Sequence, residues 1–97
     1  MVSNVYLDEM PIKVLNYDEE YVEQSGIKAK KMVFDFEVTS KDYHAITTML
    51  YKMSFDVKIP DISWYGRATI TNYSSSFTNL YEENQVGVFH LELLEDL

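Results

Sequence analysis

Residues 31–59 read KMVFDFEVTSKDYHAITTMLYKMSFDVKI, and this stretch decides the fold. In its first part apolar and polar side chains alternate, which is the period of a β-strand with one buried face. Its last part repeats that alternation and stops at Pro60, which cannot continue a ladder of hydrogen bonds. The stretch therefore predicts two strands, with the apolar positions Met32, Phe34, Phe36 and Val38 in the first and Phe55, Val57 and Ile59 in the second.

A helix is expected between these strands, from about Ser40 to near Lys52, whose cation suits the C-terminus of a helix. Thr39 and Asp42 have the spacing of a capping box, and Val38 and Tyr43 occupy the two positions of a hydrophobic staple. One helical stripe carries the apolar residues Tyr43, Ile46, Leu50 and Met53.

The rest of the chain adds further strands. A short one is expected around Val5 and Leu7, and Pro11 marks the turn into a strand from Ile12 to Tyr17. The acidic run from Asp18 to Glu23 and the residues after it, 24–26, then form a loop or a long hairpin. A later strand runs from Ile62 to Tyr73, with a bulge or a close approach at its small residues. The closing strand puts Phe89, Leu91 and Leu93 on one face and His90 and Glu92 on the other.

These elements predict a mainly β (α+β) fold in one domain, residues 1–97. We expect an antiparallel sheet of about six or seven strands, curled into an open barrel or sandwich, with the helix packed on it or plugging one end. The chain has 97 residues, 46% of them hydrophobic and 14% aromatic, which is enough for a packed core.

Composition narrows the function. The chain has no cysteine, so disulfides and thiolate chemistry are excluded. The N-terminus lacks a signal pattern and no apolar run approaches the length of a membrane span, so a cytoplasmic location without membrane association is expected.

The formal charge of −8 repels phosphate backbones and argues against nucleic-acid binding. A solvated acidic surface, a basic protein partner and imitation of a nucleic acid all agree with this charge, and the first is favoured over mimicry because the acids interleave with apolar strand positions.

The sequence contains no recognisable catalytic or cofactor site. Ser74 and Ser76, with His44 or His90, supply residue types of a hydrolytic triad, but no glycine spacing of a nucleophile elbow surrounds the serines. Two isolated histidines do not predict a metal site, and no phosphate loop or dinucleotide fingerprint is present. We therefore expect no cofactor and no metal, and no residue is assigned a catalytic role.

A ligand or interaction surface is nevertheless conceivable on the aromatic strand and the segment after it. Aromatic side chains with an arginine between them can stack on a sugar or a base, although in a β protein they are more often core or cross-strand pairs. The segment from Ser74 to Tyr81 is rich in hydroxyl and amide groups, which can instead form an internal network of bonds to the backbone. The candidate residues are Trp64, Tyr65, Arg67, Asn72, Tyr73, Ser74, Ser76, Asn79, Tyr81 and His44.

The chain also resembles the YkvR-like family of small bacterial proteins of unknown function. The resemblance runs from about Lys31 onward and is dense around Thr71 to Glu82. It is carried by Val38-Thr39-Ser40, Tyr43-His44, Leu50-Tyr51, Phe55-Asp56-Val57, Thr71-Asn72-Tyr73-Ser74, Ser76 and Thr78-Asn79-Leu80-Tyr81-Glu82. It implies a compact β-rich domain with one helix and brings no activity, cofactor or catalytic residue.

Two functions remain open at this stage. The favoured hypothesis is a non-enzymatic binding or assembly module, with a protein partner or self-association through an exposed strand edge, as in virion or tail-assembly components. The alternative is a small-ligand-binding protein or a hydrolase that uses the segment from Ser74 to Tyr81 with His44.

Overall fold

The computed structural model describes residues 2–76 and 86–96. This part of the chain contains, in order, β1 (Asn4–Leu7), β2 (Met10–Gln24), β3 (Ile27–Thr39), α1 (Ser40–Leu50), β4 (Ser54–Ile59), the short 3₁₀ helix η1 (Pro60–Ile62), β5 (Trp64–Ser75) and β6 (Val86–Glu95). No helix of these residues is long and apolar enough to cross a membrane.

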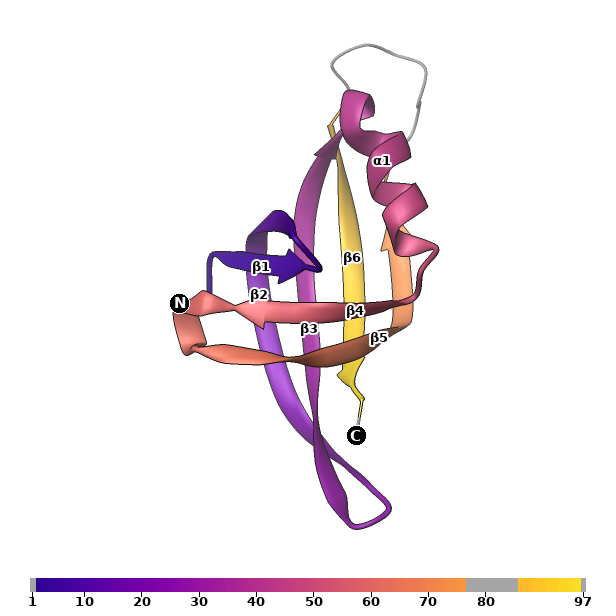
Figure 1. Ribbon diagram of the computed structural model, residues 1–97. Coiled ribbons are helices and arrows are strands. Elements are labelled where there is room, and N and C mark those ends of the chain that lie inside the picture. Colours follow the sequence, from indigo (N-terminus) through magenta and orange to yellow (C-terminus); the bar gives the residue numbers. More distant parts are fainter. Residues whose placement is uncertain (1, 77–85, 97) are drawn as a thin grey trace.

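The strands form one closed antiparallel barrel in the order β1-β2-β3-β6-β5-β4 (Figure 1). The seam between β1 and β4 closes it through only two paired positions, Tyr6 with Lys58 and Leu7 with Val57. The predicted mainly β, antiparallel fold with one helix is therefore confirmed. Of the two expected forms the structure is a barrel, and its sheet is closed rather than open.

The stretch that decides the fold behaves as its periodicity predicts. All seven of its alternating apolar strand residues are buried. Thr39 caps α1, because its hydroxyl oxygen accepts a hydrogen bond from the backbone N–H of Asp42 at 3.3 Å. The reciprocal contact differs from a standard capping box, since the Asp42 carboxylate accepts from the Thr39 hydroxyl at 3.2 Å.

The helix ends at Leu50, two residues before the predicted Lys52. Met53 adopts a left-handed conformation (φ 66°), and its N–H binds the carbonyl of Leu50, which turns the chain out of the helix. Met53 consequently leaves the apolar stripe and is 43% exposed, whereas Ile46 and Leu50 are buried.

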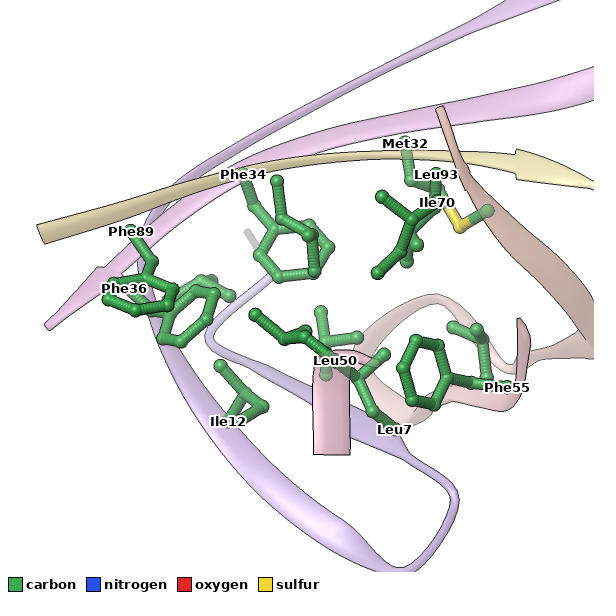
Figure 2. Packing of buried hydrophobic residues seen from close by; sticks show 14 of the residues in the cluster. Leu7, Ile12, Met32, Phe34, Phe36, Leu50, Phe55, Ile70, Phe89 and Leu93 are labelled. Carbon is green, nitrogen blue, oxygen red and sulfur yellow. The ribbon is translucent and has the colours of Figure 1, made fainter. Parts of the chain in front are cut away.

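The core fills the barrel between its strands and α1. Phe36 lies between Phe34 and Phe89, with ring centroids 6.0 and 5.7 Å away. Figure 2 shows Leu50 reaching from the end of α1 into this cluster, so the helix contributes to the core.

The longest feature is the hairpin of β2 and β3, which projects beyond the other strands (Figure 1). Ser25 and Gly26 both have positive φ, as a tight two-residue turn requires. The region predicted as a loop or a long hairpin is therefore a long hairpin. Residues 21–30, here called the arm, pair only within the hairpin, because the ladder between β3 and β6 begins at Lys31.

Two irregularities shape the sheet. The register shifts between Val14 and Asn16 in β2 and between Ile70 and Asn72 in β5. The close approach expected among the small residues of β5 is at Gly66, where an added Cβ would lie 2.8 Å from the Trp64 ring. The bulge lies further along, at position 71.

Candidate functional site

An unpaired stretch of backbone runs along β2. The partner strand β1 covers β2 only from Met10 to Lys13, and the N–H of Val14 binds the carbonyl of Ser3. From residue 15 to residue 24, no backbone partner lies on that side among the described residues. We call this stretch the free edge.

The free edge is acidic. Its ten residues carry four carboxylates and no basic side chain, and all four of these carboxylate residues are exposed. Glu19 and Glu20 face lysines of β3, with Nζ to Oε distances of 2.5 Å from Lys30 and 3.9 Å from Lys31. The four residues are Asp18, Glu19, Glu20 and Glu23.

A buried lysine fixes the base of the arm to the barrel. Lys30 is only 4% exposed, and its Nζ lies 5.2 Å from the Trp64 ring centroid and 5.8 Å from that of Tyr21. Its backbone N–H also binds a carboxylate oxygen of Glu95 at 3.0 Å. These contacts compensate the burial of the cation, which would otherwise be costly.

The electrostatics of this anchor agree with a charged pair. The hydrogen bond from Lys30 holds the pKa of Glu19 below its usual value. Burial and the hydrogen bond to Glu19 raise the pKa of the Tyr17 phenol, whose hydroxyl donates to that carboxylate at 3.0 Å. Glu19 therefore remains ionised, with both a cation and a phenol bound to it.

The aromatic residues predicted as a stacking surface do not share one surface. Trp64 packs against the core, whereas Tyr65 is 70% exposed. Arg67 pairs with Asp56 at 3.0 Å. Tyr73 is paired with the buried Leu91 in β6, at the other end of β5. Tyr65 and Arg67 thus lie two residues apart on the exposed face of β5, whereas Trp64 turns toward the core and Tyr73 lies at the far end of the strand.

The hydroxyl-rich segment is described only in its first part. Ser74 lies opposite His90 in β6, and Ser76 binds Val88 through both its backbone N–H and its side-chain oxygen, each at 2.9 Å. His44 is exposed on α1. Asn79 and Tyr81 lie outside the described residues.

His90 was predicted from the sequence to lie on the polar face of the closing strand, and in the structure it is the centre of a polar cluster. Its Nδ1 lies 2.6 Å from Asp35 and its Nε2 lies 3.1 Å from Glu92. Asn72, one of the predicted surface residues, donates to Glu92 at 3.2 Å. The alternation in the sequence predicts that residues 35, 90 and 92 face outward. Only the register between the strands shows that they lie next to one another.

This cluster does not match a hydrolytic triad. Although Ser74 is the cross-strand neighbour of His90, both ring nitrogens of His90 face carboxylates. The hydrogen bonds to Asp35 and Glu92 raise the pKa of His90, which favours the imidazolium and opposes the role of general base. Within residues 2–76 and 86–96, no group of three or more His, Asp or Glu side chains could hold a metal ion.

A hollow of about 430 Å³ opens where β2 and β3 diverge. The pairing of these two strands stops at Val14 and Phe36, and the rest of β2 toward its N-terminus pairs with β1. The floor is apolar and the rim carries Lys13, Glu37 and Asp42. Its floor is formed by Ile12, Val14, Phe36, Val38 and Ile46.

Taken together, these features define a small acidic β-barrel protein with one core-packing helix and a projecting acidic hairpin. The chain belongs to the family described as "Protein of unknown function (DUF3219)", whose model matches residues 4–96. It is 43% identical over 75 residues to the "Uncharacterized protein YkvR" of Bacillus subtilis (strain 168), and the alignment covers 77% of each chain. The predicted resemblance to the YkvR-like family is confirmed. Comparison with solved structures gave no match.

Proposed function

We propose that this protein is a non-catalytic binding module that takes up an extended, basic segment of a partner protein along the free edge of β2. The observation that carries the proposal is the ten-residue unpaired edge of a fifteen-residue strand. Exposed edges bind extended peptides by adding a strand, in which backbone hydrogen bonds give affinity and side chains give specificity.

Charge decides between a basic partner and a second copy of the chain. Two antiparallel copies of the free edge would place four carboxylates against four others, and like charges opposite each other destabilise a strand pair. A segment that alternates basic and apolar residues would instead face complementary charge. Self-association through this edge is therefore disfavoured.

The anchor at Lys30 supports the same proposal. Because Lys30 is held between Tyr21 and Trp64, the base of the arm is fixed to the barrel before any partner arrives. A pre-organised strand loses less conformational entropy on binding than a disordered one does.

A direct test uses a short fluorescent peptide that alternates lysine and valine, with fluorescence anisotropy and amide chemical shifts as readouts. We expect salt-sensitive binding and shift changes concentrated in residues 15–24. A peptide with glutamate in place of lysine, and one with N-methylated backbone on its pairing edge, should both bind more weakly.

Two double variants, each of which replaces two glutamates by lysines, change the net charge of the protein by the same amount. Glu20→Lys with Glu23→Lys should abolish binding, whereas Glu9→Lys with Glu37→Lys, away from the free edge, should reduce it only slightly. Equal losses in both double variants would show that the peptide senses only the net charge. That outcome would refute the proposed edge.

A second candidate, small-ligand binding, is favoured by one observation. The hollow between β2 and β3 has an apolar floor and a volume within the range of about 300–1,000 Å³ typical of ligand pockets. Ile46→Trp would fill this hollow from α1 and leave the free edge intact. If this variant no longer binds an apolar fluorescent probe but still binds the peptide, the hollow is a ligand site separate from the free edge.

A further inference from the structure

His90 is held between two carboxylates on the outer face of the barrel. Its Nδ1 lies 2.6 Å from Oδ1 of Asp35 in β3, and its Nε2 lies 3.1 Å from Oε2 of Glu92, two residues along β6. The side chain of His90 is 38% exposed, so protons exchange readily with water.

The two carboxylates are themselves held by asparagines from the neighbouring strands. Asn16 of β2 donates to Asp35 at 2.9 Å, and Asn72 of β5 donates to Glu92 at 3.2 Å. Each asparagine is the first paired residue after a register shift in its strand. The two bulges therefore direct both amides toward the two sides of one histidine, and four strands meet in this cluster.

The geometry fits only one protonation state of the ring. A neutral imidazole has one N–H donor and one acceptor nitrogen, whereas the imidazolium has two donors. An ionised carboxylate accepts only. Both contacts of His90 are therefore hydrogen bonds when the ring is doubly protonated, and in the neutral ring one of them becomes a contact between two acceptors.

We propose that His90 is a proton-controlled latch, which in its charged form ties the β2–β3 hairpin through β6 to the end of β5 and on losing a proton releases Glu92. This inference does not rest on the proposed function, because it concerns side-chain contacts on the outer face of the barrel rather than the backbone of the free edge, to which Asn16 also belongs.

Glu92 is the carboxylate that separates. Its contact with the ring is the longer of the two, and it retains other partners, Asn72 and the Nζ of Lys31 at 3.3 Å. Asp35 keeps the shorter contact with His90 and the bond from Asn16. Once released, Glu92 and the Asn72 amide bound to it are no longer held by the ring, so the chain of side-chain contacts that runs from Asp35 of β3 through His90 to β5 residues 72–75 is interrupted.

The surrounding charges favour the closed latch near neutral pH. Hydrogen bonds to Asp35 and then to Glu92 raise the pKa of His90 above its ordinary value of 6.5. The pKa of Asp35 is lowered, chiefly by the bond from Asn16, and that of Glu92 chiefly by the bond to His90. β5 contributes only uncharged groups opposite the ring. The other charged side chains near the cluster are Lys31 and Glu37 of β3 and Asp18 and Glu20 of β2.

The sign of the effect follows from these directions. Because the folded protein binds the His90 proton more tightly than the unfolded chain does, the contribution of the latch is complete below the ordinary pKa of histidine. It is lost as pH rises through the raised pKa of His90.

The first test is NMR titration of the histidine side chains in the full chain, with the two signals assigned by His44→Gln. We expect the ring of His90 to titrate as the imidazolium with both nitrogens protonated below its midpoint. Asp35→Asn and Glu92→Gln should each move that midpoint to lower pH, whereas Glu23→Gln should not. An unchanged midpoint in both cluster variants would overturn the latch.

The second test separates the latch from simple stabilisation. Amide hydrogen exchange at residues 72–75 should accelerate above the His90 midpoint by roughly two- to tenfold more than it does in β4, the reference strand. This excess corresponds to the loss of one net hydrogen bond. His90→Gln should remove this pH-dependent excess at every pH. The same excess in His90→Gln, or its absence in the wild type, would refute the proposal even if the variants remain folded.

Discussion

Replacement of Lys30 by methionine tests how the arm is joined to the barrel. Lys30 is the one buried charged residue in the described part of the chain, with its ammonium above the Trp64 and Tyr21 rings and beside Glu19. Lys30→Met keeps an unbranched apolar side chain and removes the charge. We expect the protein to stay folded and to lose stability.

The expected size follows from the contacts. A cation–π contact contributes about 0.5–1 kcal/mol at an exposed site and about 2 kcal/mol when the cation is desolvated, and the cost of burying the Lys30 ammonium offsets part of this gain. Glu19 is 36% exposed, so water replaces much of its lost partner and the ion pair adds less than about 1 kcal/mol. Lys30→Met should therefore cost about 1–2 kcal/mol. Lys30→Ala also removes three buried methylenes, which adds about 2 kcal/mol.

Urea unfolding measures this loss. Trp64 is the only tryptophan of the chain, so its fluorescence reports on the anchor, and circular dichroism follows the barrel. With a slope of about 1–3 kcal/mol/M, the midpoint of Lys30→Met should fall by roughly 1 M. Lys28→Met, at an exposed lysine of the same arm, is the control. If Lys30→Met is as stable as the wild type or more so, the cation contributes no more than an apolar chain would, as some buried ion pairs do.

Three further perturbations test other parts of the structure. Thr39→Ala removes the cap of α1 and should cost about 1 kcal/mol; an unchanged unfolding midpoint would show that the cap is dispensable. Gly66→Ala places a methyl group 2.8 Å from the Trp64 ring and should cost about 1–3 kcal/mol, with altered fluorescence; wild-type stability and emission would contradict the close packing. The hydrogen bond from Lys52 lowers the pKa of Asp8. The contribution of the Asp8 carboxylate to folding stability is therefore present above the ordinary pKa of 3.8 and is lost as pH falls through the lowered pKa. Asp8→Asn should therefore flatten the acid side of the stability profile measured by thermal unfolding, and an unaltered profile would exclude this linkage.

The periodicity of the sequence was sufficient to predict the strands of the barrel, because each strand has one buried face. The alternation around Phe34 and around Val57 depends only on neighbours along the chain, and both strands are as predicted. The end of α1 was predicted near Lys52 because a cation suits a helix C-terminus, and the helix ends two residues earlier, at Leu50. In the structure the Lys52 ammonium instead binds Asp8 at 2.6 Å, in a turn 44 residues earlier.

The candidate surfaces were harder to predict because they depend on register. Asp35 and His90 are 55 residues apart in the sequence, and only the ladder between β3 and β6 brings them to 2.6 Å. The free edge likewise follows from the shortness of β1, which leaves most of β2 without a neighbour. The acidic run of β2 was recognised in the sequence, but its position along an unpaired edge required the structure.

The position of β6 also governs the order in which the chain can fold. Before β6 is present, β3 and β5 have no common neighbour, and the two halves of the sheet meet only at the two-residue seam of β1 and β4. A ribosome must therefore synthesise the chain through residue 95 before the apolar faces of β3 and β5 can be covered together. Such long-range pairing closes slowly, and the nascent chain carries an exposed apolar sheet until its last strand arrives.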